Sequence, residues 1–145
     1  MTEEELQALV GHRFPGGTVT VEHWENVLFS DVMGVEPLPD GLVHPAALFH
    51  VPLAGSGVRI GDIFELFRAE SDEAVRGGEY AWEIHRPLRE ETPYRAGGEV
   101  VSVERKQSRK LGPMDAVTFR FELHDDADGE LVARVHATWL FLRSA

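Results

Sequence analysis

Cysteine is absent from the sequence of 145 residues, and basic side chains and long apolar runs are scarce. The lack of cysteine excludes disulfides, a thiolate zinc site and a cysteine nucleophile. With 14 basic against 25 acidic side chains, the formal net charge is -11, which repels the phosphates of nucleic acid. No stretch approaches the ~20 apolar residues of a membrane-spanning helix, and residues 1–10 contain no basic, apolar leader. We therefore expect a cytoplasmic protein that binds neither nucleic acid nor a membrane.

The composition is typical of one globular domain. Hydrophobic residues make up 43% and charged residues 27% of the chain, which is ordinary usage for a folded protein. A length of 145 residues suits one hydrophobic core. We predict a single domain over residues 1–145, in which residues 1–10 form a lead-in segment.

The first half of the chain has mostly helical or irregular patterns. Thr18 to Glu22 alternates as a short strand, and His23 to Met33 then carries apolar residues at helical spacing up to Gly34. Pro45 to Ala54 is apolar on nearly every side, as in an enclosed helix, although Pro52 should kink or interrupt it. The apolar face of the first helix consists of Trp24, Val27, Leu28 and Val32.

The pattern changes to strand-like alternation near Gly77-Gly78, after a second amphipathic helix at Arg59 to Arg68. Four strands are predicted, at Glu79 to Arg86, Gly98 to Lys106, Ala116 to His124 and Leu131 to Arg143. The polar turn Asp125 to Gly129 makes the last two an antiparallel hairpin. Strands this long need a covered apolar face, and the segment from Pro45 is the best candidate to cover it. The sequence thus predicts an α+β fold, with an antiparallel sheet of about five strands around a central helix.

This arrangement and several local sequences resemble the hotdog fold of the MaoC-like dehydratases, in particular their N-terminal-type domains. The likeness runs from Gly11 to Arg143, and the order and spacing of its fragments carry it. The fragments are Gly11 to Pro15, Thr18 to Val21, the helix through Trp24, Ser30-Asp31, Gly41 to Pro45, Arg86 to Leu88, Gly98 to Val103, and Asp128 to Glu130 with Val132-Ala133. The resemblance implies that the substrate is an acyl thioester of coenzyme A or acyl carrier protein and that water is added or removed across its 2,3 double bond. It also implies that no further cofactor is needed and that two hotdog domains pair.

The catalytic motif of that family is incomplete in this chain. Active members use a Gly-Asp-x-Asn-Pro-x-His segment at the end of the first helix. Asp31 takes the place of the aspartate, but Met33, Gly34 and Glu36 stand where Asn, Pro and His are expected. Hydration needs a base that activates water and an acid that protonates C2. The resemblance therefore implies an acyl-thioester-binding subunit of an enoyl-CoA hydratase or 3-hydroxyacyl dehydratase, whose second hotdog chain supplies the Asp/His pair.

Asp31 and His44 are the candidate catalytic residues of this chain. Asp31 is either a paired or perturbed carboxylate on the apolar side of its helix or an exposed residue at the helix end. His44 lies with Val43 at the entry to the central helix, where it either approaches the thioester or serves as a structural hydrogen-bonding group. Asp40 would orient the imidazole of His44 if the loop turns back. We interpret His50 as a core or interface histidine.

Basic side chains gather in one stretch of this acidic chain: Arg105, Lys106, Arg109 and Lys110. The stretch is either a solvated loop or a site that attracts the phosphates of coenzyme A or the acidic surface of acyl carrier protein. The seven histidines show no metal-ligand spacing, so no metal site is predicted.

Two alternative functions stay open. A hotdog acyl-CoA thioesterase would need an acidic group near the central helix, and Pro45 to Val58 contains no carboxylate. A non-catalytic homodimer would bind the acyl group without proton transfer. In every case we expect a homodimer or heterodimer, because a single hotdog leaves one long sheet edge unprotected.

Overall fold

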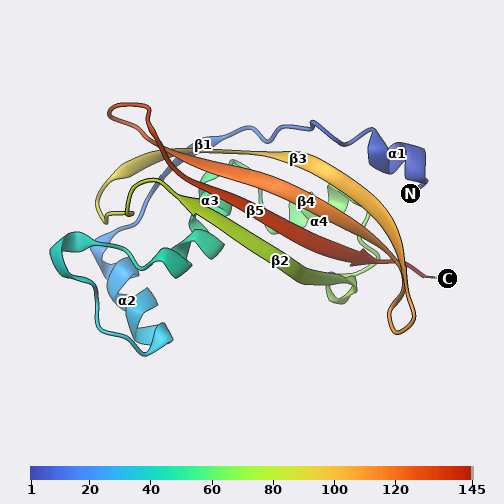
Figure 1. The fold of residues 1–145 in the computed structure, drawn as a ribbon, viewed down its shortest axis with the longest axis horizontal. Coiled ribbons are helices and arrows are strands. Elements are labelled where there is room, and N and C mark those ends of the chain that lie inside the picture. Colours follow the sequence, from blue (N-terminus) through green and yellow to red (C-terminus); the bar gives the residue numbers. More distant parts are fainter. Residues whose placement is uncertain (145) are drawn as a thin grey trace.

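A five-stranded antiparallel sheet forms the body of the protein (Figure 1). The structure, a computed structural model, describes residues 1–144, and within this range the strand order is β1-β3-β4-β5-β2. The strands are β1 (Gly17–Thr20), β2 (Val75–Ile84), β3 (Pro93–Ser108), β4 (Gly112–Asp125) and β5 (Leu131–Leu142). The sheet curves around short helices on one of its faces, so the expected α+β fold with a central helix is confirmed.

Strands β2 and β3 begin earlier than the sequence predicts. Strand β2 begins at Val75 because its pairing with β5 continues past a bulge that follows Gly77. A Cβ atom on Gly78 would lie 2.8 Å from the carbonyl oxygen of Thr138, so a glycine lets the two strands stay paired there. Strand β3 begins at Pro93 because its first residues pair with β1. The glycines near the start of β2 therefore belong to the sheet and do not separate it from the first half of the chain.

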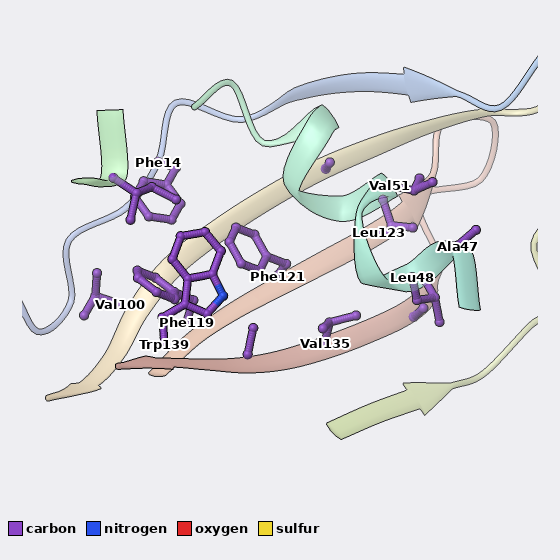
Figure 2. Close-up of a cluster of buried hydrophobic side chains, with 14 of the residues drawn as sticks. Phe14, Ala47, Leu48, Val51, Val100, Phe119, Phe121, Leu123, Val135 and Trp139 are labelled. Atoms are coloured by element: carbon purple, nitrogen blue, oxygen red, sulfur yellow. The ribbon is translucent and has the colours of Figure 1, made fainter. Parts of the chain in front are cut away.

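The central segment consists of two short helices, η2 (Pro45–Phe49) and α3 (Val51–Gly55), separated at His50. The interruption agrees with the expected effect of Pro52, whose ring excludes a continuous helix through the preceding turn. The buried side chains of this segment include Ala47, Leu48 and Val51, which belong to the hydrophobic core cluster in Figure 2. Phe49 and His50 are exposed. The segment is therefore covered mainly on one side, whereas the sequence predicts a helix enclosed on most sides.

Aromatic rings fill the space between the sheet and the helices. Phe119 lies at the centre, with its ring centroid 5.2 Å from that of Trp139 and 5.7 Å from that of Phe67. Phe67 directly follows α4 (Ile60–Leu66) and also packs on Phe141, at 5.1 Å. Edge-to-face contacts of this kind favour a fixed arrangement of the rings. They fix α4, the predicted second amphipathic helix, against the sheet.

Helix α3 approaches the sheet most closely at Gly55. A Cβ atom on Gly55 would lie 2.7 Å from the Cβ of Ala96 in β3 and 2.8 Å from the Cβ of Val19 in β1. Such distances are shorter than van der Waals contact, so a residue without a side chain is required here. The position of the central segment over β1 and β3 depends on this contact.

Helix α2 (His23–Met33) has the predicted bounds but does not bury its predicted apolar face. It ends at Gly34, which has a left-handed backbone with φ 69°. Its fully buried residues are Asn26 and Ser30, whereas Val32 of the apolar face is 78% exposed. The helix is therefore rotated so that a polar pair, four residues apart, faces the rest of the protein.

The remaining helices are short. They are α1 (Glu3–Gln7), η1 (Pro39–Gly41) and η3 (Asp72–Ala74). A capping box between Thr2 and Glu5 begins α1, and the buried Leu6 holds this part of the predicted lead-in segment against the core. Over residues 1–144, no helix combines the length and the apolar character that crossing a membrane requires.

A buried ion cluster holds the sheet together near the turn between β3 and β4. This turn lies at the end of the sheet opposite α2 (Figure 1). Asp115 of β4 is fully buried and accepts hydrogen bonds from Arg105 Nε and Arg143 Nε, both at 2.7 Å. Arg143 also donates to the carbonyl oxygens of Phe67 and Arg68, at 2.8 and 2.7 Å. Burial alone would raise the pKa of Asp115, but the hydrogen bonds from the two guanidinium groups outweigh it and hold that pKa below its usual value.

Replacing Gly55 with alanine is expected to lower the free energy of unfolding by about 1–3 kcal/mol, because the new methyl group overlaps Val19 and Ala96. Urea denaturation measures the change. Gly61→Ala in α4 is the matched control, since a Cβ atom there meets nothing within 4 Å. Alanine at Gly61 should leave stability unchanged or raise it by up to about 1 kcal/mol. Equal losses in the two variants would contradict the close approach of α3 to the sheet.

Asp115→Asn is expected to lower the free energy of unfolding at neutral pH by about 3 kcal/mol, because two guanidinium groups lose the buried charge that they share. The folded state depresses the pKa of Asp115, so its stabilising effect is present above the usual value of 3.8 and is lost as the pH falls through the folded pKa. Denaturation curves over a pH series should therefore show the gap between wild type and variant closing in acid. A gap independent of pH would mean that the charge of Asp115 does not stabilise the fold.

Candidate functional site

Two cavities lie at the end of the central segment that faces α2, and Val43 lines both of them. The larger has a volume of about 260 Å³ and a mainly apolar lining, to which His85 and Arg86 also contribute. Its apolar residues are Leu38, Leu42, Val43, Pro45, Ile84, Pro87 and Leu88. The smaller has a volume of about 70 Å³ and lies between α2 and the central segment. Its lining includes Asn26, Phe29, Val43, Ala47, His50 and Val51. The buried side chain of Val43 is thus a wall common to both cavities.

His44 follows Val43 in the chain but is not itself part of the lining of either cavity. It precedes η2, and its Nδ1 accepts a hydrogen bond from the backbone N–H of Ala46 at 3.1 Å. A neutral imidazole that accepts at Nδ1 carries its proton on Nε2. His44 can therefore donate a hydrogen bond from Nε2 while its ring is held by the backbone.

The two candidate carboxylates are not joined to His44. Asp31 is exposed in the last turn of α2 and is not part of the lining of either cavity. Asp40 is exposed, with a left-handed backbone at φ 59°, and its carbonyl oxygen accepts from Arg89 Nη1 at 2.9 Å. Within residues 1–144 no hydrogen bond connects Asp40 with His44, whose ring is oriented by the Ala46 amide.

The predicted basic residues lie at the other end of the sheet. Arg105 is bound to Asp115, Lys106 Nζ lies 2.9 Å from Glu104, and Arg109 and Lys110 occupy the turn between β3 and β4. Along β3, the distance from Ala96 beside α3 to this turn is about 40 Å at ~3.3 Å per residue. A single ligand would have to extend over that distance to contact both the basic residues and the cavities.

Asn26 is the buried polar residue of the smaller cavity, with 2% of its surface exposed. Its Nδ2 donates to the Leu42 carbonyl oxygen at 3.2 Å and to Glu90 Oε2 at 2.8 Å. Both partners are acceptors, which fixes the orientation of the amide. Asn26 Oδ1 is then buried without a hydrogen-bond partner among the described residues. An unpaired buried acceptor costs about 1–3 kcal/mol and is uncommon in folded proteins.

Two ionisable residues, His50 and Glu25, complete the smaller cavity. The His50 ring packs on Phe29 with centroids 5.3 Å apart, and loss of hydration lowers the pKa of His50, against a smaller opposing effect of Glu25. The imidazole is therefore neutral near pH 7. Glu25 Oε2 accepts from the backbone N–H of Glu22 at 2.8 Å, which holds the carboxylate at the start of α2. Over residues 1–144, no three His, Asp or Glu side chains are grouped so that they could hold a metal ion.

A wider groove, of about 540 Å³, crosses the outer face of the sheet over Gly97. Its basic side chains are already paired with acids. Arg13 Nε lies 3.3 Å from Glu99, Arg120 also binds Glu99, and Arg95 Nε lies 3.4 Å from Asp126. A ligand would have to displace these ion pairs, so the cavities beside Val43 are the better candidate site.

Of the residues predicted from the sequence, Val43 lines both cavities, and His44 follows it in the chain without lining either one. The sequence pattern does not indicate Asn26, Ala47, His85 or Arg86, which also line the cavities. A polar residue in the middle of an amphipathic helix predicts a solvent-facing position, which is the opposite of where Asn26 lies. Its position follows from contacts with Leu42 and Glu90, which are distant in the sequence. His50 was interpreted as a core or interface histidine, and the structure places it in the lining of the smaller cavity.

The sequence matches no protein-family model and no curated protein. Among solved structures, a chain of the ChsH1-ChsH2 complex from Mycobacterium tuberculosis matches with a TM-score of 0.72 at 18% identity, over 98% of this chain and 89% of that one. A chain of the HadBC (3R-hydroxyacyl-ACP dehydratase) complex from the same organism matches with a TM-score of 0.65 at 18% identity, over 91% and 96%.

A structure described as a MaoC-like dehydratase matches with a TM-score of 0.72 at 20% identity, over 96% of this chain and 44% of that one. A thioesterase from Thermus thermophilus, complexed with coenzyme A and Zn, has a TM-score of 0.56 at 16% identity, over 90% and 82%. The matches to these dehydratase structures cover 91–98% of this chain with TM-scores of 0.65–0.72. The protein therefore has the hotdog fold of the MaoC-like dehydratases.

Proposed function

We propose that this chain is the acyl-thioester-binding subunit of an enoyl-thioester hydratase or 3-hydroxyacyl dehydratase, and that a second hotdog chain supplies the Asp/His pair. The observation that carries the proposal is the larger, mainly apolar cavity, which is lined by Val43 and Pro45 on either side of His44 and by Ile84, the last residue of the edge strand β2. Its volume of about 260 Å³ falls just below the ~300–1,000 Å³ of a complete ligand pocket. A second chain at that edge would complete the pocket.

Strand β2 has the features of an edge that pairs with another chain. It lies at the end of the sheet order, and its residues Trp82 and Ile84 are 40% and 46% exposed. Phe49, exposed beside it, stacks on Tyr80 of the same strand at 4.7 Å. Long, apolar, unpaired edges favour the addition of a further strand. The two Mycobacterium tuberculosis structures with this fold are complexes, which supports a pairing of hotdog chains here.

The side chains of this chain support binding better than complete catalysis. Addition of water requires a base and an acid within hydrogen-bond reach of one water molecule. Glu36 takes the place of the expected histidine, and Asp31 is exposed outside the cavities. His44 also lies outside the lining, but it stands between Val43 and Pro45 of the larger cavity, and its free Nε2–H would donate to a thioester oxygen at the cavity mouth, where negative charge develops in the transition state. We assign His44 to orienting the thioester and the proton transfers to the partner.

The purified chain is expected to bind acyl-CoA, measured by calorimetry, without hydrating crotonyl-CoA or longer enoyl-CoAs. Hydration should appear when the hotdog chain that co-purifies from the native source is added. Loss of absorbance of the enoyl thioester follows the reaction. Hydration by this chain alone that Asp31→Asn abolishes would contradict the division of labour. Release of free thiol from acyl-CoA would instead establish a thioesterase.

Trp82→Asp is expected to weaken association through β2 by at least about tenfold, because it places a charge in the apolar edge. Sedimentation equilibrium, with this chain alone and with its co-purified partner, measures the association. Leu111→Asp is the matched control, since Leu111 is also an exposed apolar residue, 49% exposed, but lies in the turn between β3 and β4. An equal effect of the two substitutions, or no effect of the first, would place the interface elsewhere.

A further inference from the structure

We infer that the smaller cavity binds a hydroxyl group at or near the end of the acyl chain, with Asn26 Oδ1 as the hydrogen-bond acceptor. The inference rests on the proposed function and names its substrate class, which is hydroxylated acyl thioesters. It concerns a hydroxyl remote from the reacting carbons, in a cavity that contains neither Asp31 nor His44.

The polar groups of this cavity call for a hydrogen-bond donor. Asn26 Nδ2 is fully used by Leu42 and Glu90, so the amide offers the cavity an acceptor. Asn26 Oδ1 is buried and has no partner among residues 1–144. A ligand group that donates a hydrogen bond would pair this oxygen within the buried cavity, whereas an alkyl group would leave it unpaired.

The size and walls of the cavity favour a hydroxyl on a carbon chain. A volume of about 70 Å³ accommodates about two water-sized groups, each of ~30 Å³. Phe29, Ala47 and Val51 supply apolar walls that suit the carbon bearing the hydroxyl. Val43 lines both cavities, which are therefore adjacent, and a turn of its side chain would let the end of a chain bound in the larger cavity reach Asn26. The pantetheine arm of coenzyme A is too large for this volume.

A neutral hydroxyl also fits the charges better than an ammonium group. Burial of an ammonium group is costly unless its charge is paired, and His50 can supply no negative charge in either protonation state. Glu25, the carboxylate of the lining, is held at the start of α2 by the backbone N–H of Glu22. A hydroxyl can donate to Asn26 and needs no counter-ion.

The first test compares each ω-hydroxyacyl-CoA of a chain-length series with the acyl-CoA in which a methyl group replaces the hydroxyl. At the best length, the hydroxylated compound should bind at least about fivefold more tightly in calorimetry, which reflects one satisfied buried acceptor. Asn26→Leu should abolish or reverse this preference. An equal loss of affinity for both compounds in that variant would assign Asn26 to the pantetheine arm or to folding, and would overturn the inference.

Because Asn26 also binds Leu42 and Glu90, a second variant separates ligand binding from folding. Ala54→Leu fills the exposed mouth of the cavity without removing those hydrogen bonds, and it should abolish the preference for the hydroxyl while the folded state persists. Ala8→Leu is the matched control, because Ala8 is exposed at the end of α1 and should leave the preference intact. A preference that survives Ala54→Leu would contradict the assigned cavity.

A measurement without thioester distinguishes this inference from the proposed function. Short primary alcohols, but not alkyl chlorides of the same length, should shift the NMR signals of the Asn26 side-chain amide, and Ala54→Leu should remove the shift. If alcohols act at Asn26 and no acyl-CoA binds, the hydroxyl site stands and the proposed function fails. If acyl-CoAs bind and neither alcohols nor hydroxyacyl-CoAs act at Asn26, the cavity holds only water and the inference is wrong.

Discussion

The close contact of Gly55 with β1 and β3 is the constraint on which the rest of the structure depends. It sets how near α3 lies to the sheet, because a single methyl group at Gly55 would overlap Val19 and Ala96. With α3 held there, η2 and the loop before it must lie further along the same face, toward the end of β2. The cavities around Val43 are the space that these short elements leave. The candidate site is thus a consequence of helix packing more than of any single polar residue.

Buried polar groups divide the molecule into a stabilised end and a functional end. Asp115 is buried with two guanidinium partners, so its charge supports the fold. Asn26 is equally buried, but its Oδ1 has no partner within the described residues. A buried polar atom without a partner lowers stability, and it is retained where it serves a function such as ligand recognition. The contrast supports placing the binding site near α2 and away from the basic turn between β3 and β4.

The sequence predicts those parts of the fold that depend on local periodicity. The bounds of α2, its end at Gly34 and the break caused by Pro52 follow from residues within one or two turns. The rotation of α2 about its axis does not follow from nearby residues, because Asn26 donates hydrogen bonds to Leu42 and Glu90, which are distant in the sequence. A sequence pattern identifies the apolar face of a helix but not whether this chain or another covers it. Local sequence likewise predicts that Val43 and His44 precede the central segment, but it does not predict the cavity at Asn26, which depends on contacts between distant residues.

The incomplete cavity and the unpaired edge are two aspects of one geometry. Ile84 ends the edge strand and also lines the larger cavity, so a chain that pairs with β2 necessarily approaches the ligand. A ligand that contacts both chains binds the pair more tightly than the single chain, and by linkage it strengthens their association to the same degree. Under the proposed function, the acyl group would act as part of the interface core. Proton-transfer groups supplied across that interface would be correctly placed only in the assembled state, and a chain without the Asp/His pair would still determine the substrate.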